Sequence, residues 1–274
     1  MTILTPIVSV LTILAYFILS IFMPIFGYLV PYYKIKKVNI FGSKYRLIVN
    51  LSVALILYII NIKILIIYLI YPFLTEFLFY LILRIKAKIK TFDKVVIMSL
   101  ISTLIITTII YYNRLYLENI VEEAFKASEL TLNMDVRDLY TTFLQLRKNL
   151  VSSIFSYLFI ANIFLFLTLL PNTYEVWKIS PYWLVPFMLI IVLNKVSGLV
   201  LNEFFSENVI AIVRYIYTWY GVKTLYLLST KVGIKFNLLK HTLSIVLAII
   251  YPLPVFVLGA LASFDIVEVE TIKI

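Results

Sequence analysis

Apolar residues occur along this chain in long runs, each close to the length that crosses a lipid bilayer. A transmembrane helix needs about 20 predominantly apolar residues. The first run, residues 3–30, is longer than one span and contains Pro24, so it forms either one kinked helix or a helix followed by a short re-entrant piece. The remaining apolar runs occupy residues 47–60, 64–83, 95–112, 150–170, 184–202, 209–229 and 242–262. The pattern predicts an all-α, polytopic transmembrane helical bundle of about eight spans.

The segment 113–149 interrupts these runs with a different pattern. It holds eleven charged residues, and its apolar residues recur at intervals of three and four, which is typical of an amphipathic helix. Unpaired charges are costly in hydrocarbon. We therefore predict an extramembrane amphipathic helical hairpin over 113–149, between an N-terminal transmembrane half (1–112) and a C-terminal transmembrane half (150–274).

Composition supports a membrane protein and excludes several kinds of site. The chain is 63% hydrophobic and 14% charged, whereas a soluble domain is nearer half apolar and a quarter charged. It contains no cysteine, which excludes disulfides and thiolate metal sites. Its single histidine, His241, excludes a metal site built from several histidines. We expect no metal and no cofactor.

The basic residues predict an orientation. The net charge is +10, and in a membrane protein such an excess usually lies in cytoplasmic loops rather than on a nucleic-acid-binding surface. Placing the basic segments 32–46, 84–94 and 231–241 in the cytoplasm puts the 113–149 hairpin and the acidic C-terminus outside. We expect a multi-pass protein of the cell (plasma) membrane that binds no nucleic acid. The N-terminus is outside if the first run spans once and inside if it breaks.

Charged residues within the apolar runs are the candidates for chemistry, because they are costly there and usually have a function. Glu76 lies in the third run, Lys195 follows Asn194 in the sixth, and Arg214 lies in the seventh. The functional interpretation is a ligand-binding polar pocket between helices in which Glu76 pairs with Lys195 or Arg214. The alternative is that ion pairs hold the bundle in one packing, or that the long cations extend to the membrane surface.

Motifs of soluble enzymes are absent from the sequence. There is no phosphate-binding glycine loop, no HExxH and no GxSxG, so we expect neither an ATPase nor an enzyme with a catalytic residue. Asn50, Asn162 and Asn202 are interpreted as interhelical hydrogen-bonding residues rather than ligands.

The second half of the chain, over residues 115–270, resembles the YybS-like family of bacterial membrane proteins, whose function is unknown. The resemblance depends on the order of several features along the chain. They are the Pro/Trp loop 171–183, Asn208, a Tyr-x-x-x-Gly sequence at 217–221, Pro252, Pro254, Leu258, Gly259 and Asp265. The tail after Asp265 is acidic here, whereas that of the family is usually basic. The family in turn resembles the substrate-binding membrane subunits of energy-coupling-factor transporters. This resemblance implies ATPase and transmembrane coupling subunits as partners.

Two functions follow as hypotheses. The first is a substrate-binding transmembrane subunit of a small-molecule transporter that lacks its own ATPase, with a polar pocket near the outer half of the bundle. The alternative is a non-catalytic scaffold or interaction protein of the cell envelope, with a solid bundle and no ligand-sized cavity. A membrane enzyme is the third and least favoured, because few groups are available for acid–base chemistry.

The predicted orientation is testable by cysteine labelling, for which the cysteine-free chain gives no background. A cysteine placed at Ser128 should react with an impermeant maleimide from outside intact cells, and one placed at Lys235 only from the cytoplasmic side. Labelling of position 128 from the cytoplasmic side alone would contradict the orientation.

Overall fold

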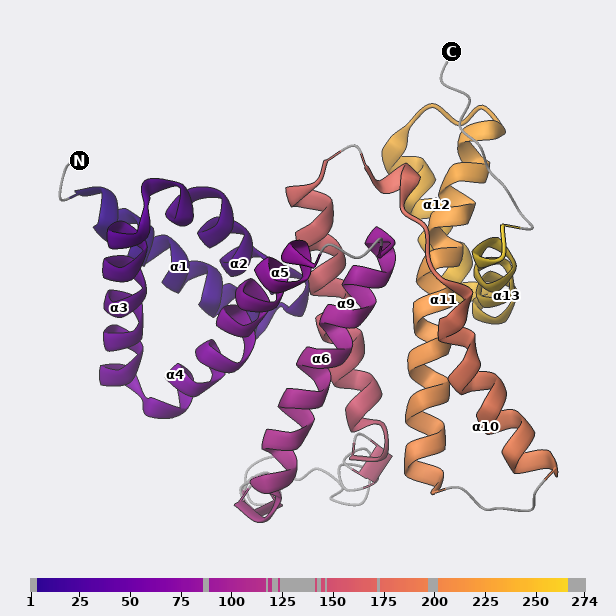
Figure 1. The fold of residues 1–274 in the computed structure, drawn as a ribbon, viewed down its shortest axis with the longest axis horizontal. Helices are drawn as coiled ribbons and strands as arrows, with labels where there is room; N and C mark the ends of the chain where they lie inside the picture. The colour runs from indigo at the N-terminus through magenta and orange to yellow at the C-terminus, as the bar shows by residue number, and fades with distance from the viewer. Residues whose placement is uncertain are drawn as a thin grey trace, which may run out of the picture. The chain divides into compact units, whose positions relative to one another are not determined.

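The computed structural model describes residues 4–85, 89–116, 118–119, 123, 141, 144–145, 147–171, 173–196 and 202–265, and the regular elements in these ranges are all helical. The longer helices are α1 (Leu4–Phe22), α3 (Ser43–Ile60), α4 (Ile62–Tyr68), α5 (Leu74–Arg84), α6 (Thr91–Tyr112), α9 (Leu150–Leu169), α10 (Val185–Val196), α11 (Glu203–Lys231), α12 (Asn237–Ile250) and α13 (Pro252–Ser263) (Figure 1). The chain forms two compact units. Unit 1 comprises residues 1–89, 94–106 and 157–174, and unit 2 comprises 90–93, 107–156 and 175–274.

In the part of the chain that the structure describes, five helices are long and apolar enough to cross a membrane. They are Thr5–Phe22, Ser43–Ile60, Ile62–Arg84, Thr91–Tyr112 and Leu150–Leu169. These helices match the first five predicted runs, which confirms a multi-pass helical membrane protein as the coarse fold. The first run breaks, because α1 ends at Phe22 and Pro24 begins the short 3-10 turn η1 (Pro24–Phe26) before α2 (Leu29–Tyr33).

The last three predicted runs differ from simple spans. Helix α10 has 12 residues, and the end of its run lies outside the described residues. Helix α11 has 29 residues but is not among the strongly apolar helices. The run 242–262 contains α12 and α13, which meet at an angle of 115°, so it forms a broken span or a re-entrant loop. Proline cannot donate the hydrogen bond that would continue the helix, which explains the break at Pro252.

The core of unit 1 joins α1 to α3. Buried residues repeat every four positions along α3, as expected of one helix face: Tyr45, Val49, Val53 and Leu57. Ser9 on α1 adds a polar contact, since its hydroxyl lies 2.7 Å from the hydroxyl of Tyr45. At Asn61 the chain turns from α3 into α4, and the Asn61 side chain accepts a hydrogen bond from the Lys63 amide, which caps the new helix (Figure 1).

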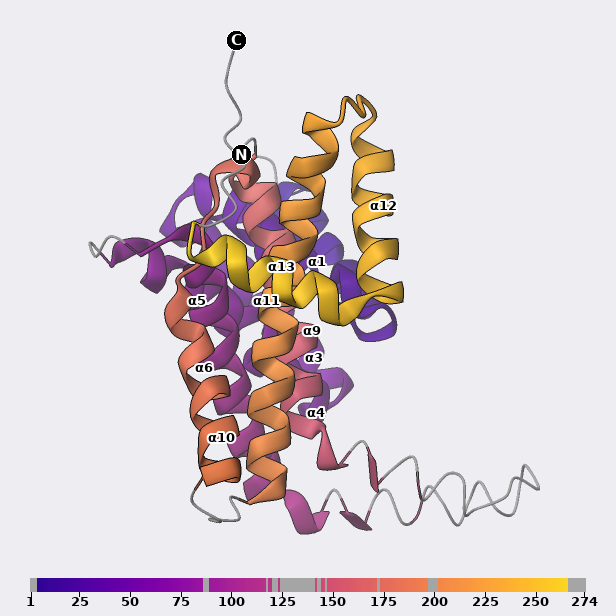
Figure 2. The same ribbon diagram turned by 90° about the vertical axis from the view of Figure 1, so that its right-hand side faces the viewer.

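Within unit 2, two glycines bring α11 and α13 into backbone contact. Figure 2 shows α13 running across α11. A Cβ at Gly221 would clash with the Val255 carbonyl oxygen, and a Cβ at Gly259 would clash with the Tyr217 carbonyl oxygen. Small residues permit such close helix crossings in membrane proteins.

The predicted hairpin 113–149 lies mostly outside the described residues. Its two ends are described, and the Arg147 guanidinium lies 3.0 Å from the Glu118 carboxylate. This exposed ion pair brings the beginning and the end of the segment together.

Gly259→Ala should destabilise the protein. Alanine gains about 1 kcal/mol over glycine in a helix interior, but overpacking against a backbone carbonyl costs about 1–3 kcal/mol, and this carbonyl cannot move without shifting α11. The measurement is thermal unfolding in detergent, followed by circular dichroism. Val257→Ile adds a methylene at an exposed position of the same helix and should have little effect. Equal unfolding temperatures for Gly259→Ala and the unsubstituted protein would contradict the close crossing.

Candidate functional site

A buried ion pair lies in unit 1 between Lys34 and Glu76. The Lys34 ammonium is 2.6 Å from the Glu76 carboxylate, and the two side chains are 0% and 9% exposed. Breaking a buried pair by removing one partner is costly because it leaves an uncompensated charge. The pair therefore constrains the two segments that carry it.

Lys34 is buried because it occupies a buried helical face. It follows Val30 by four residues and precedes Val38 by four, and all three residues are 0% exposed. Lys34 begins the π-helical turn η2 (Lys34–Val38). Glu76 lies in the first turn of α5, which follows a second π-helical turn, η4 (Leu69–Phe73).

Asn39 and Tyr80 extend the pair into a network. The Asn39 amide nitrogen donates a 2.8 Å hydrogen bond to Glu76 Oε1 and lies 2.7 Å from the Tyr80 hydroxyl. Aromatic rings surround the cation, with Lys34 Nζ 4.9 Å from the centroid of Phe73. Ring faces attract cations. The carboxylate and the ammonium thus both have partners other than water.

Two adjoining cavities lie beside this network, and together we call them the arginine pocket. The smaller has a volume of about 260 Å³ and is lined by Arg46, Asn50, Phe73, Glu76, Phe77 and Tyr80. The other has a volume of about 430 Å³ and is lined by Asn39, Arg46, Phe77, Tyr80, Leu81 and Arg84. They adjoin because three of these residues line both.

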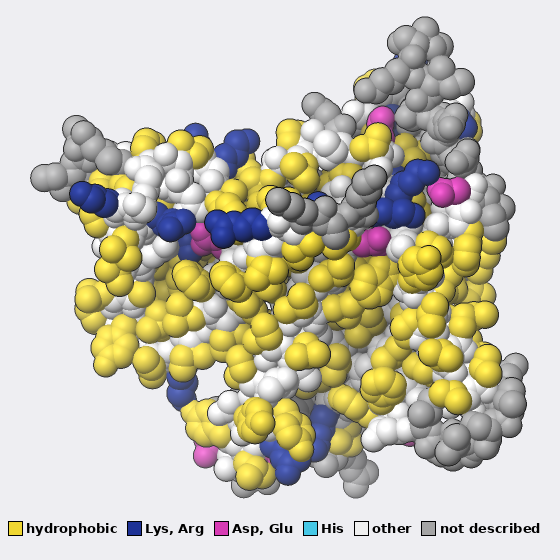
Figure 3. Space-filling model, in the orientation of Figure 1, with side chains coloured by type: hydrophobic (Ala, Val, Ile, Leu, Met, Phe, Trp, Pro, Cys, Tyr) yellow, Lys and Arg dark blue, Asp and Glu magenta, His cyan; other side chains and the backbone are white. Residues whose placement is uncertain are grey.

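The arginine pocket favours a negatively charged ligand. Arg46 near the start of α3 and Arg84 at the end of α5 are exposed and line the same cavity. Neither arginine has a salt bridge to a carboxylate in the described part of the chain. The acid in the lining, Glu76, is already neutralised by Lys34. Over α1–α5, Figure 3 shows most of the visible Lys and Arg side chains at one end of the helices, beside a broad hydrophobic surface.

The predicted site residues belong to different units. Glu76 is in unit 1, whereas Asn194, Lys195 and Arg214 are in unit 2. Asn194 and Arg214 are exposed, and the Lys195 side chain lies outside the described residues. The ion-pair partner that the structure gives to Glu76 is Lys34, which lies in the basic segment 32–46 predicted to be a cytoplasmic loop. The buried valines four residues on either side of Lys34 are the signal that could have identified it.

Unit 2 has its own polar contacts, which hold the Pro/Trp loop. Helix α6 begins at Thr91, four residues before the predicted apolar run 95–112 begins. Asp93 therefore lies in the first turn of the helix. Asp93 Oδ1 accepts hydrogen bonds of 2.9 Å from the Ser180 amide and from Trp183 Nε1. Lys223, which is buried, donates to the Trp177 carbonyl. These contacts indicate a structural role for the loop.

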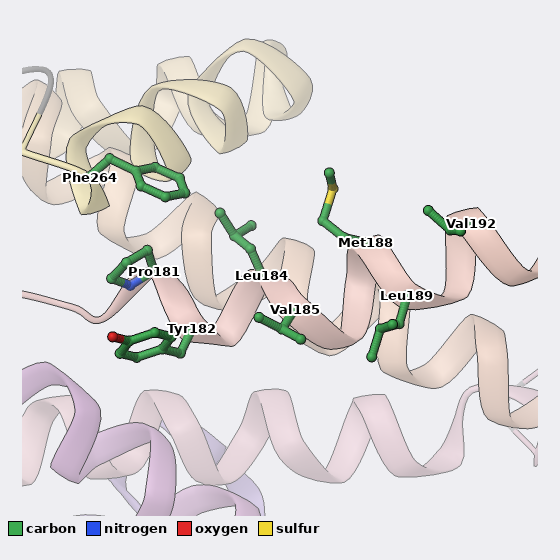
Figure 4. Close-up of a pocket in the computed structure, with 8 residues that line it drawn as sticks. All are labelled: Pro181, Tyr182, Leu184, Val185, Met188, Leu189, Val192 and Phe264. Atoms are coloured by element: carbon green, nitrogen blue, oxygen red, sulfur yellow. The ribbon is translucent and has the colours of Figure 1, made fainter.

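A further cavity, in unit 2, is lined almost entirely by apolar side-chain atoms. It has a volume of about 370 Å³, and it lies along α10 with Phe264 at one end (Figure 4). Its lining residues are Pro181, Tyr182, Leu184, Val185, Met188, Leu189, Val192 and Phe264. Such a groove is typical of a surface that faces lipid tails.

Exposed ion pairs of unit 2 keep their charges near neutral pH. Hydrogen bonds from Lys148 to Glu207 and Glu203 raise the pKa of the Lys148 ammonium, and the same contact lowers the pKa of Glu203. The hydrogen bond from Lys178 lowers the pKa of Asp265, which follows α13. As exposed pairs they contribute little to stability.

Comparison of the chain with models of protein families, with curated proteins and with solved structures finds no match. The resemblance to the YybS-like family therefore stays a prediction.

Lys34→Met should destabilise unit 1 more than the double change Lys34→Met/Glu76→Gln. The single change leaves the Glu76 charge buried and unpaired, for which about 3–5 kcal/mol is typical, whereas the double change removes both charges. Thermal unfolding in detergent would measure both. Lys37→Met is the matched control, because Lys37 is exposed in the same segment. If the double variant unfolds at or below the temperature of the single variant, the Lys34–Glu76 ion pair does not constrain the two segments that carry it.

Proposed function

We propose that this chain is an integral membrane protein that binds a small anionic molecule in the arginine pocket of unit 1. The observation that carries the proposal is the convergence of Arg46 and Arg84 from two helices on one cavity. Arginine binds carboxylate and phosphate through paired hydrogen bonds, which single surface lysines do not reproduce. Asn39 and Tyr80 supply further polar groups, and Phe77 and Leu81 supply apolar walls.

A ligand pocket supports the transport hypothesis over the scaffold hypothesis, which requires a solid bundle. In this proposal the chain is the substrate-binding transmembrane subunit of a small-molecule transporter, and ATPase and coupling subunits are separate chains. The pocket lies at the end of the helices that carries the basic residues of the segments 32–46 and 84–94. With those segments cytoplasmic, substrate exchange at this pocket takes place from the cytoplasmic half rather than the outer half.

The proposal keeps the finer topology predicted from the sequence. Five strongly apolar helices and the bent pair α12–α13 account for up to six spans. Helices α10 and α11 supply the other two of the eight, with the 113–149 hairpin outside and the basic segments in the cytoplasm. The less apolar α11 is tolerated because Lys223 is buried against protein rather than lipid.

Isothermal titration calorimetry with n-butyl phosphate, a soluble phosphate monoester, tests the proposal on protein in a non-ionic detergent. A charge-assisted hydrogen bond contributes about 1.5–3 kcal/mol, and 1.4 kcal/mol is tenfold in affinity. Arg46→Gln/Arg84→Gln should therefore weaken binding by at least about tenfold.

The matched control for this test is Lys36→Gln/Lys37→Gln. It removes two exposed positive charges from the same unit without changing the pocket lining. The control should bind as the unsubstituted protein does. Equal losses in both variants would indicate non-specific attraction, and absence of binding to the unsubstituted protein would favour the scaffold function.

A further inference from the structure

The arginine pocket opens onto an exposed apolar stripe. Phe73, Phe77 and Leu81 are 43%, 55% and 41% exposed, and they follow one another at four-residue intervals. Residues four apart share a helix face, so the three side chains form one stripe along α5 and its preceding turn. Arg84, three residues beyond Leu81, continues that face to the pocket.

This stripe belongs to a helix suited to a bilayer. Ile62–Arg84 is one of the five strongly apolar helices, so its exposed face meets lipid tails when the protein is in a membrane. A ligand that occupies both the stripe and the arginines must have an apolar part and an anionic part. A membrane lipid meets this requirement, and a free anion does not.

We propose that the arginine pocket binds an anionic phospholipid. Arg46 and Arg84 hold the phosphate, and an acyl chain lies along Phe73, Phe77 and Leu81. This inference rests on the proposed anionic pocket and assigns its ligand to the bilayer.

Native mass spectrometry of the purified chain in non-ionic detergent tests the inference with lipids of identical acyl chains. Phosphatidylglycerol, whose head group carries a net negative charge, should bind at least about tenfold more tightly than phosphatidylcholine, whose head group is zwitterionic. Arg46→Gln/Arg84→Gln should lose most of the preference for phosphatidylglycerol, and Lys36→Gln/Lys37→Gln should keep it. These comparisons include the unsubstituted protein, so they hold even if a pocket variant folds poorly.

A soluble competitor separates the inference from the proposed function. Glycerol 3-phosphate has the polar groups without the acyl chains, so it should bind at least about tenfold more weakly than phosphatidylglycerol. Arginine-dependent binding of glycerol 3-phosphate or butyl phosphate, without a preference for phosphatidylglycerol, would overturn the lipid inference and leave the anionic pocket. Failure of all these phosphates to bind would overturn both.

Discussion

The ion pair between Lys34 and Glu76 is the contact on which the candidate site depends. A charged residue at the centre of a transmembrane helix costs about 2.5–3.5 kcal/mol on insertion scales, and Glu76 lies within the apolar helix Ile62–Arg84. Lys34 compensates this charge from the segment that follows α2, where burial would otherwise leave its own ammonium without a partner. Each charge is tolerated because the other one is present.

The geometry of the pocket follows from this pairing. With Glu76 directed inward, Phe77, one position further along the helix, turns to another face and is exposed, and Phe73, four residues before Phe77, is exposed as well. The Asn39 amide nitrogen is held by Glu76 and Tyr80, which keeps this side chain in the lining of the cavity. The arginines at the ends of α3 and α5 then complete a site with an anionic preference and an apolar wall.

The apolar runs of the sequence predict where the long helices lie. They do not predict features that depend on a single side-chain or backbone contact. The run 64–83 becomes the helix Ile62–Arg84 because its side chains are predominantly apolar over a length that can cross a bilayer. Asn162 donates to Ser99 on a neighbouring helix, which confirms the predicted interhelical bond, whereas Asn202 caps the start of α11. Lys34 was assigned to a loop because charge counts ignore the buried face on which it lies. A hydropathy profile does not predict the break at Pro252, because it measures how apolar the side chains are and not which backbone hydrogen bonds can form.

An experimental structure of the protein in lipid nanodiscs tests the central claim most directly, through one measurement: the separation of the Lys34 ammonium and the Glu76 carboxylate. The account predicts a salt bridge, close to the 2.6 Å found here, with both side chains buried in unit 1. A Glu76 side chain that faces lipid, or one that pairs with Lys195 while Lys34 lies in solvent, would contradict it.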